Sequence, residues 1–273
     1  MLLSLVVIFK PQSDCILSAA TGRYVHGLLL DLIAKKDKTL GEELHQEARS
    51  KSFTVSPLFG EFRPCQKARN QFNKEQEYWF RVTALQHDIA HLLVDIFTDK
   101  KFKHFQIGEQ PMHVTGTIMD SGKHEWAGTS SYAEIYDRYI IKQQKITKQI
   151  RIYFQTPTTF KVNQHQLVLP NPTTLFYSTL EKWNQHSEIP VHQEDFLSWL
   201  DNNCVVSRHH IRTRMLDYGK FQYVGFTGSV EFTDMSKKET VYRALWNMLA
   251  EYSFWSGIGA KTTMGMGMAR LEN

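Results

Sequence analysis

The sequence predicts an α+β protein of two tandem domains, each with the element order βαββαβ, and a glycine-rich loop near the C-terminus. The length of 273 residues suits two domains of about 100 to 150 residues each. Hydrophobic residues make up 42% of the chain and recur at strand and helix spacings in the same order in both halves. The third observation is the close spacing of glycines in residues 256–271, which predicts the glycine-rich loop.

The first half starts with an apolar strand at residues 2–9. After Thr21, apolar residues in the range 25–33 recur at helical spacing, and Thr39 with Glu42 forms the T-x-x-E capping box of a second, short helix. The remaining segments read as strand, strand, helix and extended chain: residues 52–62, 77–85, 87–97 and 102–118. This order predicts a ferredoxin-like (RRM-like) fold.

The second half repeats the element order without a visible sequence repeat. Its segments read as strand, two helices, a hairpin and a helix: residues 148–157, 171–185, 193–202, 204–216 with 220–233, and 237–255. We expect the glycine-rich loop to deliver a last strand in which Met264, Met266 and Met268 share a core-facing side.

A polar stretch at residues 121–147 separates the halves, and we expect a helix or a linker there. The sequence therefore predicts an N-terminal domain at residues 1–125, a linker at 126–147 and a C-terminal domain at 148–273.

Composition excludes several classes of protein. The three cysteines Cys15, Cys65 and Cys204 lie far apart without a CxxC pair, which supports neither a disulfide framework nor a cysteine zinc site. The opening residues 1–11 are too short and lack the basic start of a secretory signal, and no stretch of about 18 apolar residues could span a membrane. We expect a cytoplasmic protein with no membrane partner.

Charge is modest in sum, at +4, but it is clustered. Residues 63–74 carry Arg63, Lys67, Arg69 and Lys74 without an acid. A second acid-free segment holds three arginines and two histidines: Arg208, His209, His210, Arg212 and Arg214. Together with the glycine-rich loop, these segments indicate contacts with the phosphates of a nucleic acid.

The glycine-rich loop has the pattern GxGxxxxxGxG: Gly257, Gly259, Lys261, Thr262, Thr263, Gly265 and Gly267. A P-loop would need glycine at Ala260, and a dinucleotide fingerprint would need glycine at Thr262, so both are excluded. Glycine permits positive φ and close approach of backbone N–H groups to an anionic polymer, with Lys261 as a point charge. The alternative is a glycine-rich hairpin that joins a helix to an edge strand.

Histidines His87 and His91 have an i, i+4 spacing that suits metal ligands, but "HDIAH" lacks the glutamate of the zinc protease motif. We expect them on a solvated helix face, and we expect neither a metal nor another cofactor.

Three segments resemble one family. They are "GIGAKTTMGMGMARL" at the C-terminus, "ELHQEARSKSFTVSPLFG" in the first half, and "IYFQTPTTF" with "LVLPNPTTLFYSTLEKWN" at the start of the second half. They resemble the CRISPR-associated endoribonucleases of the "Cas six" family, in the RAMP superfamily. The resemblance implies two ferredoxin-like domains, a metal-independent cut in the repeat of precursor CRISPR RNA, and a repeat hairpin that stays bound, in some cases within an effector complex.

The chemistry of such a cut needs a proton-transfer group and a cation near the phosphate, because the ribose 2′-hydroxyl is the nucleophile and leaves a 2′,3′-cyclic phosphate and a 5′-hydroxyl. His45 can act as general acid or base, and Arg49 or Lys51 can offset the phosphate charge. The resemblance also implies a catalytic lysine at the position of Lys51. Some members place a tyrosine where this chain has Leu30, so that role stays open among three residues: Arg23, Tyr24 and His26.

The main alternative function is a catalytically inactive subunit of the same superfamily that holds guide RNA. A generic RRM-type RNA binder would carry aromatic-rich RNP strands, which this sequence lacks.

Overall fold

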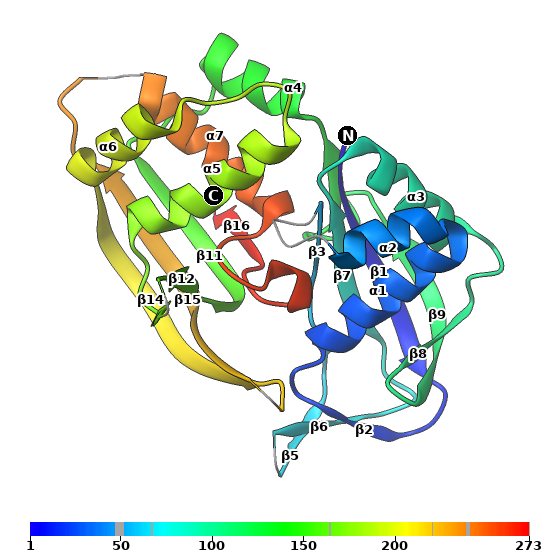
Figure 1. Ribbon diagram of the computed structural model, residues 1–273. Helices are drawn as coiled ribbons and strands as arrows, with labels where there is room; N and C mark the ends of the chain where they lie inside the picture. Colours follow the sequence, from blue (N-terminus) through cyan, green and yellow to red (C-terminus); the bar gives the residue numbers. More distant parts are fainter. Residues whose placement is uncertain (47–51, 67, 164, 220, 239–240, 273) are drawn as a thin grey trace. The chain divides into compact units, whose positions relative to one another are not determined.

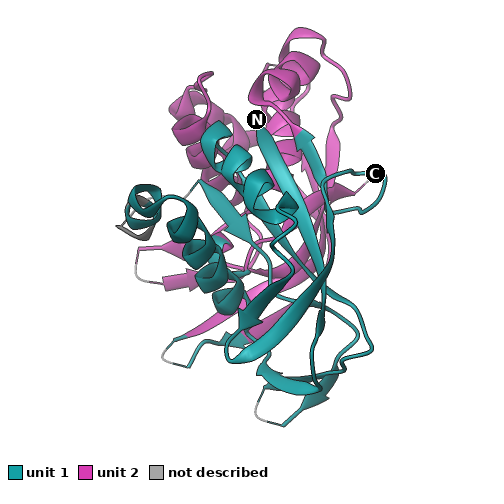
Figure 2. Ribbon diagram, turned by 90° about the vertical axis from the view of Figure 1, so that its right-hand side faces the viewer, with its two compact units in different colours: residues 1–129, 216–221, 263–265 teal, residues 130–215, 222–262, 266–273 magenta. Residues whose placement is uncertain are grey.

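The computed structural model describes the chain except for residues 47–51, 67, 164, 220, 239–240 and 273 (Figure 1). Contacts between Cα atoms divide it into two compact units, which Figure 2 colours separately. Unit 1 comprises residues 1–129, 216–221 and 263–265, and unit 2 comprises residues 130–215, 222–262 and 266–273. Each unit is described by itself below.

Unit 1 is built on an antiparallel sheet with the strand order β3-β7-β1-β9-β8. Its strands are β1 (Leu2–Pro11), β3 (Phe53–Val55), β7 (Tyr78–Ala84), β8 (His104–Ile107) and β9 (Gln110–Ile118). Two short strands add to this sheet: β4 (Phe59–Gly60) pairs with β7, and β10 (Gly128–Ser130) pairs with β1. Its helices are α1 (Gly22–Lys36), α2 (Lys38–Gln46) and α3 (His87–Thr98). A small separate sheet has the order β2 (Cys15–Ser18), β6 (Arg69–Phe72) and β5 (Arg63–Cys65).

The core of unit 1 follows from the period of its strands and helices. β1 is buried on both faces from Leu2 to Val7, and its alternate residues from Leu3 to Phe9 belong to one core cluster with the apolar stripe of α1 at Val25, Leu29 and Ile33. Figure 1 shows α1 and α3 on the same face of the sheet. This places the N-terminus of α1, the region of Arg23 and Tyr24, at one end of the layer of helices.

Unit 2 is built on an antiparallel sheet with the order β14-β15-β11-β16. Its elements are α4 (Tyr132–Tyr136), a π-helical turn (Asp137–Ile141), β11 (Gln149–Thr158), β12 (Phe160–Val162), β13 (His165–Leu167), α5 (Pro172–His186), α6 (Gln193–Asn203), β14 (Cys204–Asp217), β15 (Gln222–Asp234), α7 (Val241–Ser256) and β16 (Ala269–Glu272). A 3₁₀ turn covers Thr262–Met264. The core packs Phe176 of α5 between Phe232 of β15 and Trp246 of α7.

Both main sheets place the strands of a βαββαβ unit in the order second, third, first, fourth. This is the ferredoxin-like arrangement, so the predicted fold class is confirmed. The boundaries 1–125, 126–147 and 148–273 stay a prediction. Among the residues that the structure describes, no helix is long and apolar enough to cross a membrane.

Two local predictions are wrong. The second helix begins at Lys38, and Asp37 rather than Thr39 accepts a hydrogen bond at its start, from the backbone N–H of Leu40 (3.0 Å). Thr21 directly precedes α1, as predicted, and its hydroxyl accepts from the N–H of Leu58.

The second wrong prediction concerns the last strand, which covers only Ala269–Glu272. Met264 ends the 3₁₀ turn, and Met266 and Met268 lie in irregular chain, where both are buried. The predicted single methionine face therefore does not form, although Met266 and Met268 do belong to the core.

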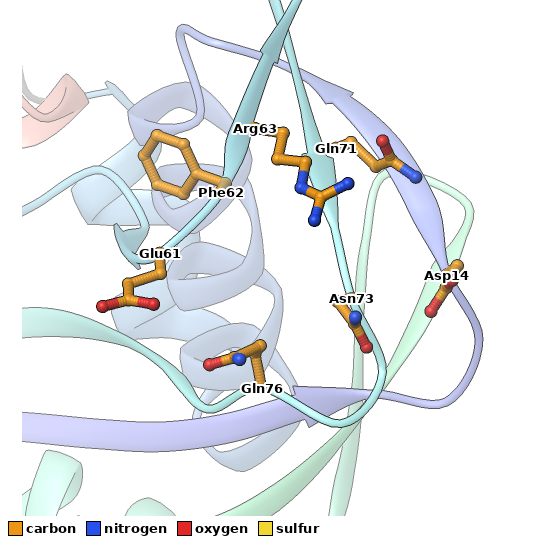
Figure 3. Close-up of a pocket in the computed structure, with 7 residues that line it drawn as sticks. All are labelled: Asp14, Glu61, Phe62, Arg63, Gln71, Asn73 and Gln76. Atoms are coloured by element: carbon orange, nitrogen blue, oxygen red, sulfur yellow. The ribbon is translucent and has the colours of Figure 1, made fainter.

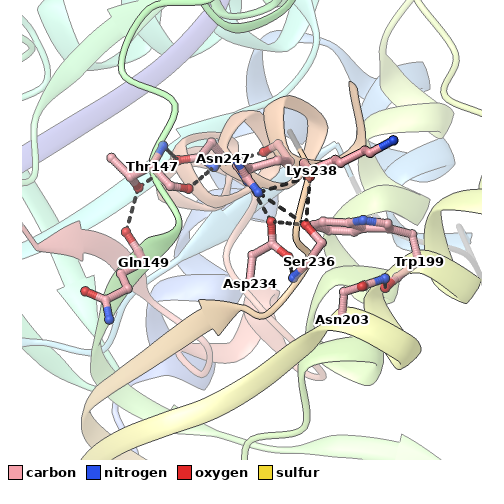
Figure 4. A network of polar contacts seen from close by, with 9 residues as sticks. Thr147, Gln149, Trp199, Asn203, Asp234, Ser236, Lys238 and Asn247 are labelled. Carbon is pink, nitrogen blue, oxygen red and sulfur yellow. Dashed lines mark hydrogen bonds and ion pairs between the residues drawn. The ribbon is translucent and has the colours of Figure 1, made fainter. Parts of the chain in front are cut away.

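A buried ion pair fixes the start of α7 to the end of β15 (Figure 4). Arg243 Nε donates to Asp234 Oδ2 at 2.6 Å, and its Nη2 donates to the Ser236 hydroxyl and to the Lys238 carbonyl. The side chains of Arg243 and Asp234 are 5% and 0% exposed. Because removal of one partner leaves a buried charge unpaired, this pair is costly to break.

We predict that Arg243→Met lowers the free energy of unfolding by about 3 to 5 kcal/mol, the range for breaking a buried pair. Urea denaturation followed by circular dichroism measures this loss. The matched control is Arg151→Met, because Arg151 pairs with Glu231 at 2.8 Å but is half exposed, so its change should be much smaller. Equal losses in both variants would contradict the role given to the buried pair.

Candidate functional site

The N-terminus of α1 meets two distant segments of unit 1. A Cβ atom on Gly22 would overlap the carbonyl of Met264 and would lie 2.7 Å from the Cα of Gly265. The N–H of Leu58, in the segment that follows β3, donates to the Thr21 hydroxyl at 2.8 Å. Parts of two segments that carried the family resemblance, Leu58 and Gly265, therefore contact the first turn of this helix.

Two of the predicted catalytic residues, Arg23 and Tyr24, lie side by side in that first turn. Arg23 Nη1 donates to the carbonyl of Tyr218 at 2.8 Å, Nη2 donates to the Tyr24 hydroxyl at 3.1 Å, and the guanidinium lies 4.9 Å from the centre of the Tyr24 ring. The Tyr218 hydroxyl in turn donates to the carbonyl of Met264 at 2.9 Å. The contacts hold Arg23 and Tyr24 in one arrangement with residues 218 and 264.

A pocket of about 590 Å³ opens beside Arg23 and Tyr24. The residues that line it come from α1, the small sheet, the turn after β8 and the tip of the β14–β15 hairpin: Ile16, Leu17, Ser18, Arg23, Tyr24, Ala68, Arg69, Gly108, Glu109, Gln110, Asp217 and Gly219. Two cations, Arg23 and Arg69, line this pocket together with two acids, Glu109 and Asp217. The guanidinium groups can bind a phosphate, and the Tyr24 hydroxyl adds a hydrogen-bond donor.

His26 lies one helical turn after Gly22, half-buried, with its ring stacked on Phe53 at a centroid distance of 5.8 Å. It does not line the pocket of Arg23 and Tyr24. His45 lies near the end of α2, and its side chain is outside the described part of the structure. Lys51 and Arg49 also fall outside the described residues. The positions of these three side chains relative to Arg23 therefore stay a prediction.

The arginines and histidines of the acid-free segment in β14 are all exposed: Arg208, His209, His210, Arg212 and Arg214. β14 is an edge strand of the sheet of unit 2. Arg208 lies 4.0 Å from Glu231 but is 80% exposed, so the pair leaves most of its charge in solvent. This strand can present cations to a polyanion.

The glycines of residues 257–267 have φ values of +61° at Gly257, +77° at Gly259, +90° at Gly265 and +70° at Gly267. A Cβ on Gly259 would overlap the carbonyl of Thr159, and one on Gly267 would overlap the carbonyl of Ile258. Glycine is thus required here by the protein's own backbone packing. A contact between these glycines and RNA stays a prediction.

Within the same segment, Lys261 is the exposed cation. It has a φ of +60°, and its ammonium lies 5.5 Å from the centre of the Tyr223 ring. Thr262 is buried and Thr263 is half-buried, so the charge of Lys261 is more accessible to a ligand than either threonine.

Sequence reasoning missed Lys182, whose ammonium is buried beneath this segment. Its Nζ donates to the carbonyl of Ser256 at 2.7 Å, to that of Gly257 at 3.3 Å and to the hydroxyl of Thr262 at 3.2 Å. Burial lowers the pKa of Lys182 to about 7. The signal that could have identified it is a lysine at helical spacing from the apolar residue Leu175, on the helix face that also carries Thr179.

We predict that Lys182→Met changes how stability depends on pH. The pKa of Lys182 in the folded protein, about 7, is below the ordinary value of 10.5, so above pH 7 the unfolded chain binds more protons than the folded one. Stability from this group therefore rises with pH between about 7 and 10.5, and the methionine variant should lack that rise. Urea denaturation at pH 6.5, 8 and 9 measures it, with Lys161→Met as an exposed control. Parallel curves for wild type and Lys182→Met would contradict the assignment.

Comparison with known proteins places this chain in a family. The family model "CRISPR Cas6 N-terminal domain" matches residues 1–137, and the model "CRISPR-associated endoribonuclease Cas6" matches residues 152–269. A CRISPR-associated endoribonuclease Cas6 of Streptococcus thermophilus is 26% identical over 67% of this chain and 74% of its own length. One from Mycobacterium tuberculosis is 22% identical over 71% of this chain and 58% of its own length.

Solved structures agree in fold. A product complex of Cas6 (TTHB231) has a TM-score of 0.82 at 23% identity, over all of both chains. A product complex of Cas6 (TTHA0078) has a TM-score of 0.79 at 20% identity, over all of this chain and 99% of that one. With both family models matched in order along the sequence, the chain belongs to the CRISPR-associated endoribonuclease Cas6 family.

Proposed function

We propose that this enzyme cleaves precursor CRISPR RNA within the repeat, without a metal ion, and leaves a 2′,3′-cyclic phosphate and a 5′-hydroxyl. The N-terminal domain, residues 1–125, carries the catalytic residues, and the C-terminal domain, residues 148–273, binds the repeat hairpin. The activity is cytoplasmic. Two of the similar structures are Cas6 product complexes, and another is a RAMP protein that binds different RNA substrates, which supports RNA as the ligand.

The observation that carries this proposal is the arrangement of Arg23 and Tyr24 beside a pocket of about 590 Å³. Arg23 is held by the Tyr218 carbonyl and the Tyr24 hydroxyl, so its guanidinium needs little reorganisation to meet a phosphate. We assign to Arg23 the stabilisation of negative charge on the scissile phosphate, and to Tyr24 a hydrogen bond to a phosphate oxygen.

The cut itself needs two proton transfers. A base removes the proton of the 2′-hydroxyl while its oxygen bonds to phosphorus; the bond from phosphorus to the 5′-oxygen then breaks, and an acid protonates that oxygen. We assign one of these transfers to His45, because imidazole changes charge near neutral pH. Lys51 supplies a second cation near the phosphate, and His26 is the alternative proton-transfer group.

We assign binding of the hairpin to the exposed arginines and histidines of β14 and to Lys261. Contacts with phosphates dominate the affinity of most nucleic-acid complexes and make it salt-dependent. The cleaved repeat stays bound to these residues, and subunits of a CRISPR effector complex are further partners in this proposal.

We predict that the wild-type protein cuts labelled repeat RNA in the presence of EDTA, and that His45→Ala slows single-turnover cleavage by about 10²-fold or more. Hairpin affinity should stay within a few-fold, because the change removes a proton-transfer group and no phosphate contact. Gel analysis of the products and fluorescence anisotropy measure the two quantities. His91→Ala is the matched control, since His91 is exposed on α3.

Cleavage by His45→Ala at the wild-type rate would move the proton transfer to His26 or remove the assignment. Repeat RNA left intact by the wild type would favour the alternative function, a subunit that binds guide RNA without cutting it.

A further inference from the structure

The small sheet of unit 1 holds a second pocket, of about 340 Å³, that the proposed function does not use (Figure 3). Seven residues line it: Asp14, Glu61, Phe62, Arg63, Gln71, Asn73 and Gln76. Most of them lie on β5, on β6 or in the chain that joins β6 to β7. The stretch from β5 to β7 includes the basic segment 63–74. In Figure 3, Glu61, Phe62 and Gln76 lie on one side of this pocket, and Gln71 and Asp14 on the other.

The walls of this pocket are tied together by a buried tyrosine. The hydroxyl of Tyr78, a fully buried residue, accepts from the backbone N–H of Asn73 at 2.8 Å and donates to the carbonyl of Glu61 at 3.2 Å. Asp14 Oδ1 accepts from the N–H of Lys74 at 2.9 Å, which fixes the side chain of Asp14. The pocket is therefore formed in the free protein and does not have to be ordered by a ligand.

The register of the strands sets its polar groups side by side. Arg63 of β5 is directly opposite Gln71 of β6, so the guanidinium and an amide share one face of the sheet. Phe62, half-buried with its ring 5.4 Å from that of Phe72, supplies an apolar wall. Amide and carboxylate groups around an aromatic wall suit the edge and the face of a nucleobase.

Charge argues against a phosphate in this pocket. Of its lining residues, Asp14 and Glu61 are acids and Arg63 is the cation, so a phosphate would face more negative than positive charge. The occupant should instead be neutral, with hydrogen-bond donors for the carboxylates and acceptors for the guanidinium.

Among the four RNA bases, guanine satisfies both requirements. Its O6 and N7 atoms are the adjacent acceptors to which arginine binds with two hydrogen bonds. Its N1–H and N2–H₂ groups are adjacent donors that a carboxylate, which only accepts, can bind. Adenine lacks the paired acceptors, and cytosine and uracil lack the paired donors.

We propose that this pocket binds one unpaired guanine of the RNA, with Arg63 on O6 and N7 and with Glu61 or Asp14 on N1–H and N2–H₂. The inference rests on the proposed function for RNA as the ligand. Arg69, exposed on β6, lies in the same basic segment and can contact the backbone of the same strand.

The test compares short single-stranded RNAs that contain no hairpin: an eight-residue oligouridine, the same oligomer with one central guanosine, and one with inosine in its place. Anisotropy of a fluorescent label measures each Kd at fixed salt. We expect the wild type to prefer the guanosine oligomer by about 10-fold, within the range for one well-placed pair of hydrogen bonds. Inosine, which lacks the N2 amino group, should lose part of that preference.

Three single variants of the pocket keep the side-chain size: Glu61→Gln, Asp14→Asn and Arg63→Met. We expect Arg63→Met to bring the preference for guanosine below two-fold. We expect the same of whichever of Glu61→Gln and Asp14→Asn removes the carboxylate that binds the base. Glu77→Gln, an exposed change outside the pocket, should keep it. Replacement of Arg208, Arg212 and Arg214 by alanine, residues that the proposed function assigns to the hairpin, should leave the ratio of the three affinities unchanged. Thermal melts confirm that each variant is folded.

Equal affinity of the wild type for the three oligomers, no measurable binding of any of them, or an unchanged preference in the pocket variants would overturn the proposal. Cleavage of repeat RNA by the wild type is scored separately. A protein that prefers guanosine but leaves repeat RNA intact would support the guanine pocket while overturning the proposed cleavage.

Discussion

The close approach of backbone to backbone around the glycine-rich segment is the constraint on which the candidate site depends. Gly22 lies against the carbonyl of Met264, and Gly265 lies against both Gly22 and the backbone N of Pro57. A Cβ at Gly22 would overlap the Met264 carbonyl oxygen, and one at Gly265 would lie 2.9 Å from the Gly22 Cα, so a side chain at either position would force these segments apart. The first turn of α1, which carries Arg23 and Tyr24, is therefore positioned by contacts that only glycine permits.

Much of the fold could be predicted from the sequence because strand and helix periods differ. The apolar run of β1 and the stripe of α1 were read correctly, and each unit has the predicted order of elements. Local chemistry was harder to read. Thr39 matches a capping motif, but Asp37 accepts the hydrogen bond at the start of α2. The methionines from Met264 to Met268 alternate as they would in a strand, but the positive φ of Gly265 and Gly267 interrupts a strand there.

The site was less predictable than the fold, because its contacts join residues far apart in sequence. Arg23 and Tyr24 could be named from their place before His45, but nothing in the sequence indicated that Tyr218 would accept a hydrogen bond from Arg23 across 195 residues. Lys182 was missed for the same reason, since its three acceptors lie 74 to 80 residues away. The sequence suggests a ligand contact as the reason for the glycines of this segment. The structure explains Gly259 by its packing against Thr159 and Gly267 by its packing against Ile258.

The most direct test of this account is single-turnover cleavage of repeat RNA by Gly22→Ala compared with Gly27→Ala. Both changes add one methyl group to α1, but the methyl at Gly22 would overlap the Met264 carbonyl, whereas the one at Gly27 would have nothing within 4 Å. We predict that the Gly22 variant, folded by circular dichroism, loses at least about 10-fold in rate, the scale of effect when reacting groups are misplaced by an ångström. The Gly27 variant should cut like the wild type. Equal rates in the two variants would contradict the dependence of the site on this contact.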